Sequence, residues 1–322
     1  MPRSLVFLNN KGGVGKSTLA VNLSAAYAHA HPDKTVLFVD LTLTKSLARH
    51  LLGDAPPARS ADLLRALGLR RATRRRALFW AASLFPFAAA LSYVRVVPGT
   101  VALLALAALV WFRTRRGARV DVLALAATST HAPNLRVLVG GETLVPAAGA
   151  LRWREAVAEW AAPAADLVVF DLDNVLDDLA RFATGVAAFV VVPASLNMFD
   201  FDRLCVDPRN GGLFEFLATL PAGRRPALGA VIFNRLRVVG GDDNGDFAVS
   251  AADRALQEEL EARFAEKGEV GRFARMRELA PSVVRAMLDR ATPVAFLPPT
   301  TQLGAALEAA RGTLAALADA VM

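Results

Sequence analysis

The chain is poor in cysteine and histidine. Its single cysteine, Cys205, cannot form an internal disulfide, which excludes a disulfide-stabilised fold and fits a reducing cytosol. The four histidines show no metal-ligand spacing, so we expect no Cys/His metal cage. Because the N-terminus leads directly into an apolar stretch, we also expect no cleavable signal peptide.

Acidic residues are missing from one segment, residues 70–119, which contains ten arginines. The whole chain has a formal net charge of +7. Outside the segment there are 27 basic and 30 acidic residues. The basic character therefore belongs to this segment and not to the protein as a whole, which weakens an argument from net charge for nucleic-acid binding.

The same segment is strongly apolar between its arginine clusters. Two apolar runs, 77–94 and 96–112, flank a turn at Pro98-Gly99, and Arg95 is their only charge. As helices they would each span roughly 25–27 Å, slightly less than a hydrocarbon core of about 30 Å. Arginines and aromatic residues lie at both outer ends, as in the positive-inside and aromatic-belt patterns. We predict a membrane hairpin in contact with anionic lipids, with both ends in the cytoplasm.

Two alternatives for this hairpin stay open. Both runs are short and one contains Pro86, so a helical hairpin buried in a soluble protein or in an oligomer is compatible with them. Insertion could also be shallow or re-entrant. The run VALLALAALVWF has no polar face, which favours lipid over a soluble environment.

A glycine-rich stretch, KGGVGKS at residues 11–17, lies between a predicted strand at 4–8 and a predicted helix that begins at Lys16. Glycines in this context let backbone N–H groups approach phosphate oxygens, and the helix N-terminus adds positive charge. Lys16 would reach the β- and γ-phosphates of ATP, and the Ser17 hydroxyl would be a ligand of Mg²⁺. The predicted nucleotide-binding residues of this loop are Gly12, Gly13, Val14, Gly15, Lys16, Ser17 and Thr18.

The loop departs from the standard phosphate-binding pattern, because Asn10 occupies the place of the first glycine. The variant K-G-G-x-G-K-[ST] resembles the loop of the ParA/MinD family of P-loop ATPases. That resemblance implies that Lys11 is the family's additional lysine, which reaches the ATP of the partner subunit in a homodimer. The alternative, in which no nucleotide binds, is a glycine-rich turn with two solvated lysines.

A second predicted strand, 36–39, ends at Asp40. The resemblance implies a D-x-D pattern here, with the first carboxylate near Mg²⁺ and the second positioning the attacking water. This chain has Thr42 at the second place, and a hydroxyl is not a charged acceptor. We therefore expect ATP hydrolysis to be slow or to need assistance.

Further site residues lie in two later predicted strand segments, 165–174 and 227–236, and in the loop 293–300. Asp171 ends the apolar run in ADLVVFDLDN, which is typical of a carboxylate in the Mg²⁺ shell, and Asp173 is a candidate substitute for the missing second carboxylate. The resemblance implies that Asn234 contacts the adenine edge and that the loop around Pro298 covers the other side of the base. An ordinary turn at the end of a strand is the alternative for Asn234.

Alternating strands and helices predict an α/β fold, a mostly parallel sheet flanked by helices of the P-loop NTPase type, with an inserted hydrophobic helical hairpin. We expect an ATPase domain at 1–69 and 120–322 and the hairpin at 70–119. The C-terminal helix lacks a basic face, so the hairpin is the expected membrane anchor.

Three functions remain open at this point. The first is a cytoplasmic ATPase attached to the inner membrane that binds ATP and Mg²⁺, forms an ATP-dependent homodimer and positions cargo through an unidentified activator or adaptor protein. The second is a soluble ParA-type DNA-partitioning ATPase. Its support is a set of scattered arginines: Arg272, Arg275, Arg277, Arg285 and Arg290. The third is a non-hydrolysing scaffold in which ATP is structural.

Overall fold

The computed structural model describes residues 3–42, 49–53, 123, 126–139, 164–205, 212–236, 240–241, 247–301 and 303–322. These residues belong to one compact unit of the chain. The predicted hairpin at 70–119 and the predicted domain boundaries lie outside the described residues and stay predictions. Among the helices that the structure describes, none has the length and apolar character needed to cross a membrane.

An eight-stranded sheet forms the centre of the fold, with the strand order β10-β7-β6-β1-β5-β2-β4-β3. All neighbouring pairs are parallel except β3 and β4, so the predicted mostly parallel α/β sheet is confirmed. The strands are β1 (Arg3–Phe7), β2 (Val36–Asp40), β3 (Ala127–Thr128), β4 (Leu135–Val139), β5 (Leu167–Asp171), β6 (Phe189–Ser195), β7 (Ala227–Leu236) and β10 (Phe273–Arg277). A separate short hairpin pairs β8 (Gly240–Gly241) with β9 (Phe247–Ala248).

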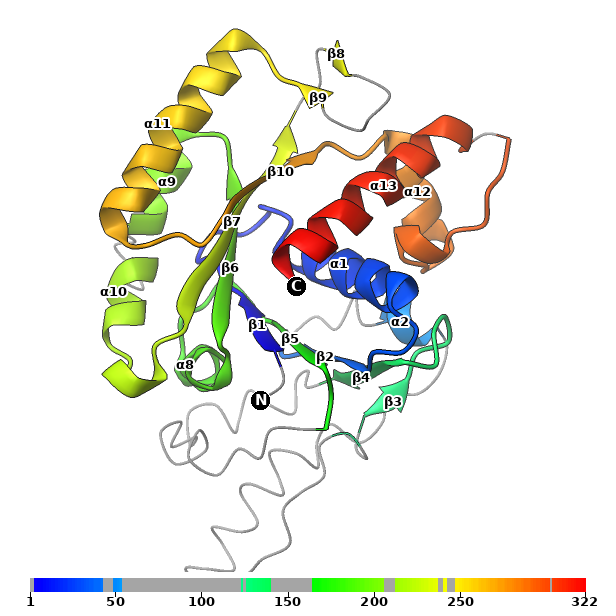
Figure 1. The fold of residues 1–322 in the computed structure, drawn as a ribbon, viewed down its shortest axis with the longest axis horizontal. Helices are drawn as coiled ribbons and strands as arrows, with labels where there is room; N and C mark the ends of the chain where they lie inside the picture. Colours follow the sequence, from blue (N-terminus) through cyan, green and yellow to red (C-terminus); the bar gives the residue numbers. More distant parts are fainter. Residues whose placement is uncertain are drawn as a thin grey trace, which may run out of the picture. The chain divides into compact units, whose positions relative to one another are not determined.

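Helices cover both faces of the sheet (Figure 1). One face carries α1 (Lys16–Ala30), α12 (Pro281–Asp289) and α13 (Gly304–Val321), and the short α2 (Arg49–Leu52) lies beside α1 in the figure. The other face carries α8 (Asp178–Val186), α9 (Met198–Cys205), α10 (Leu213–Ala218) and α11 (Ala251–Lys267). Two short 3₁₀ turns complete the description: η2 (Ala222–Arg224) and η3 (Val294–Phe296).

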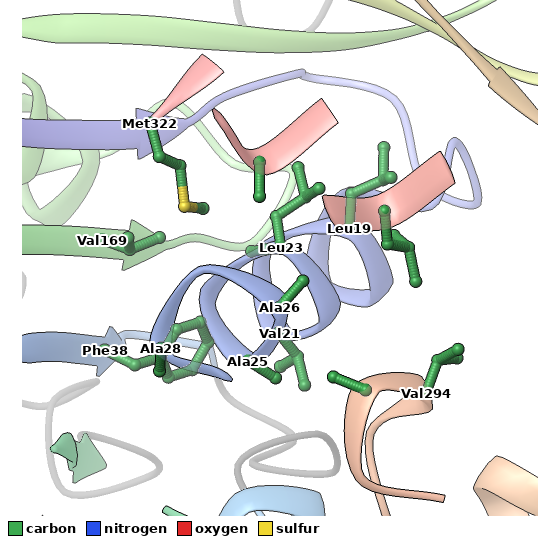
Figure 2. Packing of buried hydrophobic residues seen from close by; sticks show 14 of the residues in the cluster. Leu19, Val21, Leu23, Ala25, Ala26, Ala28, Phe38, Val169, Val294 and Met322 are labelled. Atoms are coloured by element: carbon green, nitrogen blue, oxygen red, sulfur yellow. The ribbon is translucent and has the colours of Figure 1, made fainter. Parts of the chain in front are cut away.

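The helix after the glycine-rich loop, α1, is packed on nearly all sides (Figure 2). Leu19 and Leu23 are 3% and 0% exposed. They pack in one cluster with Phe38 of β2, Val169 of β5 and Met322 after α13. Each buried leucine contributes about 1.5–3 kcal/mol to folding. This packing fixes α1, and with it the glycine-rich loop, against the sheet.

The chain leaves and re-enters the described unit at neighbouring points. The Leu51 carbonyl of α2 accepts hydrogen bonds from Ser129 Oγ at 2.7 Å and from Thr130 N at 3.1 Å. A Cβ atom on Gly53 would lie 3.6 Å from the Thr130 side chain. The ends of the excursion that contains residues 70–119 are therefore tied together.

Candidate nucleotide-binding site

The glycine-rich loop connects β1 to α1, as the sequence predicts. Gly13 and Gly15 adopt left-handed backbone conformations, with φ of 79° and 85°. A Cβ on Gly15 would lie 2.3 Å from Asn234 Nδ2, so a larger residue would have to displace the Asn234 side chain and would also be strained by the left-handed backbone. No acidic residue lies in the first turn of α1, which leaves the positive end of the helix available for an anion.

Two predicted carboxylates meet beside the loop because their strands are neighbours in register. In the register of the sheet, Asp40 at the end of β2 lies opposite Asp171 at the end of β5, and Asp171 lies opposite Phe7 of β1. Asp40 and Asp171 are each 1% exposed. The carboxyl ends of parallel strands are where α/β folds bind ligands, and here they bring both carboxylates to the start of α1.

Burial shifts the pKa values of both Asp171 and Lys16. Desolvation raises the pKa of Asp171 to about 7, with a further raising effect from Asp40, while a hydrogen bond with the Ser17 side chain and the charge of Lys16 act in the opposite direction. Desolvation lowers the pKa of Lys16, and the charges of Asp171 and Asp173 oppose that effect. The cation and the carboxylates are thus close enough to influence one another electrostatically.

The site fits a nucleotide with a divalent cation. Asp171 Oδ1 is buried and has no hydrogen-bond partner among the described residues, as expected for an oxygen that a metal ion would complete. No group of three or more His, Cys, Asp or Glu side chains in the described part of the chain could hold a metal. Magnesium usually takes one or two carboxylates and completes its shell with phosphate and water. The residues placed to hold it are Ser17, Asp40 and Asp171.

Thr42 does not point into open space. Asp40 Oδ1 accepts hydrogen bonds from Thr42 N at 2.8 Å and from Thr42 Oγ1 at 2.6 Å. Thr42 is only 5% exposed. The hydroxyl at the place where the resemblance implies a carboxylate is therefore a donor to Asp40.

Lys11 forms an ion pair within its own subunit. Its Nζ donates to Asp200 Oδ1 of α9, and the side chains of Lys11 and Asp200 are 29% and 10% exposed. The backbone N–H of Lys11 donates to Asn9 Oδ1 at 2.7 Å, and the Asn9 amide donates to the Pro193 carbonyl at 2.6 Å. The loop before Gly12 is thereby fastened to β6 and α9. The predicted contact of Lys11 with a partner's ATP stays a prediction.

Asn234 and Pro298 are placed differently. Asn234 Nδ2 donates to the Val14 carbonyl at 2.8 Å, so this residue at the end of β7 lies directly against the loop. Pro298 is exposed in the segment after η3. Their predicted contacts with adenine stay predictions.

Sequence reasoning missed three residues that the structure adds to this site. Asp200 pairs with Lys11, Asn9 fastens the loop, and Asn174 Nδ2 lies 3.7 Å from the position of a Cβ on Gly12. Asp200 belongs to the stretch MFDFDR, which contains no recognised motif, and only the packing of α9 brings it to the loop.

A family model described as the CobQ/CobB/MinD/ParA nucleotide binding domain matches residues 5–239. No curated protein sequence matches the chain.

Several solved structures share the fold. McdA from Cyanothece, in an ATP complex of a variant, is 14% identical with a TM-score of 0.63 over 99% of this chain and 96% of that one. MinD from Pyrococcus furiosus is 16% identical with a TM-score of 0.55 over 100% and 98%. Cobyrinic acid a,c-diamide synthase from Mycobacterium smegmatis, with a bound ATP analogue and magnesium, is 14% identical with a TM-score of 0.53 over 99% and 93%.

Proposed function

Because the chain belongs to the CobQ/CobB/MinD/ParA nucleotide-binding family, we propose that it is an ATP-dependent dimer switch that residues 70–119 attach to the membrane and that positions cargo through a partner protein. The observation that carries the proposal is the group at the carboxyl edge of the sheet: buried Lys16, Asp40 and Asp171 beside a helix N-terminus that has no acidic residue in its first turn.

ATP binding is the first element of the proposal. Lys16 and the loop N–H groups contact the phosphates, and Ser17, Asp40 and Asp171 hold Mg²⁺. Bound magnesium supplies charge neutralisation on the β- and γ-phosphate oxygens. The orphaned Asp171 Oδ1 and the buried ammonium of Lys16 support this assignment, because both groups gain a partner when Mg-ATP binds.

The ATP-dependent dimer is the second element. Lys11 can contact a nucleotide in another subunit only after its ion pair with Asp200 opens. The Lys11 side chain is 29% exposed but that of Asp200 only 10%, so opening the pair leaves a largely buried carboxylate and costs more than the roughly 0–1 kcal/mol of a surface pair. A triphosphate carries more negative charge than one carboxylate, so the ATP of a second subunit competes effectively for this lysine.

Membrane attachment is the third element, and its support is where the insert joins the fold. The segment follows β2, the strand that ends in Asp40, with only α2 and its flanking residues between them among the described parts. The hydrogen bonds from Ser129 and Thr130 to Leu51 close the base of this excursion. A change at Asp40 on nucleotide binding would therefore reach the base of the hairpin along a short path.

A DNA-partitioning ATPase is the second candidate function. Its support is the exposure of four arginines on the β10 edge of the sheet and on α12: Arg272, Arg275, Arg285 and Arg290. Such a patch would hold DNA through phosphate contacts that weaken steeply with salt. The net acidic composition outside residues 70–119 favours the membrane proposal instead.

Cell fractionation without detergent separates these candidates. We expect the full-length chain to stay in the membrane pellet through high salt and carbonate, and a variant lacking residues 70–119 to become soluble while it still binds ATP. Retained ATP binding shows that the shortened chain is folded. A full-length chain that is soluble and binds DNA in a salt-sensitive way would overturn membrane attachment and support the DNA candidate.

A further inference from the structure

Phosphoryl transfer to water needs a group that orients the attacking water. The carboxyl edge of the sheet offers such groups from two neighbouring strands. Asp40 of β2 pairs with Asp171 of β5, and Leu41 N donates to the Asp171 carbonyl at 2.9 Å. The strands are thus still side by side where they end, and the next residues of like orientation are Thr42 on one chain segment and Asp173 on the other.

Thr42 binds Asp40 and does not offer a carboxylate to water. Its hydroxyl and its backbone N–H both donate to the same oxygen of Asp40, and the residue is buried. Such contacts fix the orientation of Asp40 and leave no anionic acceptor at this position. Thr42 is therefore a positioning residue for Asp40.

Asp173 is better placed than the two deeper carboxylates to meet water. Asp40 and Asp171 are each 1% exposed, whereas Asp173 is only partly buried. The charge of Asp173 acts on both Lys16 and Asp171, so it lies on the nucleotide side of the edge. The adjacent Asn174 reaches within 3.7 Å of the Cβ position of Gly12, which places this segment against the loop.

We propose that the water-orienting carboxylate of this ATPase lies on the β5 segment, at Asp173, in place of a residue on the β2 segment. The inference rests on the proposed function, since it needs ATP in the site. A hydrogen bond to Asp173 orients the water, whose oxygen forms a bond to the γ-phosphorus as the bond to the β–γ bridging oxygen breaks. ADP leaves with the electron pair of that bond, and both water protons remain on the released phosphate as H₂PO₄⁻.

The test compares Asp173→Asn with a matched control, Asp178→Asn. The control removes the same charge a few residues further along, where Asp178 is half-exposed and paired with Arg181 at 3.0 Å. Three quantities are measured for the full chain in detergent: the single-turnover rate of ATP hydrolysis, the affinity for the slowly hydrolysed analogue ATPγS, and the lifetime of the ATP-dependent dimer.

We expect Asp173→Asn to slow hydrolysis about 100-fold, because misplacing a reacting group by about 1 Å costs on that order. ATPγS affinity should stay within about threefold of the unaltered chain, so that only the transition state is affected. The dimer should live longer in proportion to the slower hydrolysis. Adding Thr42→Asp to Asp173→Asn should restore the rate by about tenfold if the two positions are interchangeable. Should the double variant not fold, Asp173→Glu, which keeps the carboxylate, should hydrolyse ATP faster than Asp173→Asn.

Three results would overturn the inference. One is an unchanged hydrolysis rate in Asp173→Asn. Another is an equal loss of rate and ATPγS affinity, which would assign Asp173 to the support of the loop. The third is an unaltered chain that dimerises with ATP but does not hydrolyse it, which would leave the dimer switch intact as a scaffold. A chain that binds no ATP would overturn the proposed function itself.

Discussion

The two halves of the phosphate-binding loop, residues 11–13 and residues 14–18, differ in how far they are buried. Residues 14–18 are packed: Val14 and Lys16 are buried, and Asn234 closes on Gly15. Residues 11–13 are open: Gly12 and Gly13 are exposed, and a Cβ on Gly13 would meet nothing within 4 Å. Each half holds one lysine, and the two lysines differ in the same way.

Lys16 lies among buried carboxylates, whereas Lys11 forms one ion pair with a residue of α9. Desolvation and nearby carboxylates act on Lys16 from inside the fold. Lys11 is 29% exposed and paired with a single, largely buried carboxylate of α9. The comparison teaches that one loop can combine a buried half, held by many contacts, with an open half held by few.

The largest effect should come from the packed half. We expect Lys16→Ala to weaken ATP binding about 1,000-fold, because two charge-assisted hydrogen bonds of roughly 2 kcal/mol each would be lost. Fluorescent ATP titration measures this loss, with Lys34→Ala, an exposed lysine, as the control. Equal affinities for the two variants would contradict the assignment of Lys16.

The buried carboxylate should make stability depend on pH. The pKa of Asp171 in the folded chain is about 7, against an ordinary value of 3.8, so the folded state binds this proton more tightly than the unfolded state. The stabilisation is complete well below pH 3.8 and is lost as the pH rises through about 7, by about 4 kcal/mol in all. Urea unfolding of nucleotide-free protein should show this fall, and Asp171→Asn should flatten it. If the free energy of unfolding falls equally with pH in both proteins, the pH dependence does not come from Asp171.

Two glycine substitutions compare the halves directly. Gly15→Ala should destabilise the fold by about 2–3 kcal/mol, because a left-handed residue gains a Cβ and that Cβ clashes with Asn234. Gly13→Ala has a similar φ but no neighbour, so it should cost only about 1 kcal/mol. Thermal unfolding measures both. Adding Asn234→Ala should recover part of the Gly15→Ala loss, and no recovery would contradict the clash.

The smallest effect should come from the open half. Asp200→Asn removes the charge that holds Lys11, so the ATP-dependent dimer should form with a dissociation constant about fivefold lower, equivalent to roughly 1 kcal/mol. Asp202→Asn is the control, since Asp202 is on the same helix but more exposed and 3.8 Å from Arg263. Light scattering across protein concentrations distinguishes them. Weaker dimerisation in Asp200→Asn would oppose the proposed exchange.

Local patterns were sufficient to predict much of this architecture. Strands buried on both faces leave a continuous apolar run in the sequence, and four such runs predicted strands that the structure has. They are the run before the glycine-rich loop, the runs that end at Asp40 and Asp171, and the stretch 227–236. The two-residue strand β3 and the edge strand β10 were not predicted. β3 has only two residues, and β10, FARMR, has arginines on one side, so neither is a continuous apolar run.

Site contacts between distant segments could not be predicted. The glycine-rich loop has a local motif, but the partner of Lys11 lies 189 residues further along the chain. The sequence showed only that Thr42 stands where a carboxylate is expected. The hydrogen bond from its hydroxyl to Asp40 could be found only in the structure. Pairings set by the packing of a whole helix, such as α9, leave no spacing rule in the sequence.

The tie between Leu51 and Ser129–Thr130 has a consequence for how much chain the protein can carry there. A chain that departs from and returns to a domain at one closed point can carry segments of very different length there without disturbing the sheet. The described unit can therefore gain or lose chain at this point by a single insertion or deletion while its sheet and its nucleotide site stay as they are.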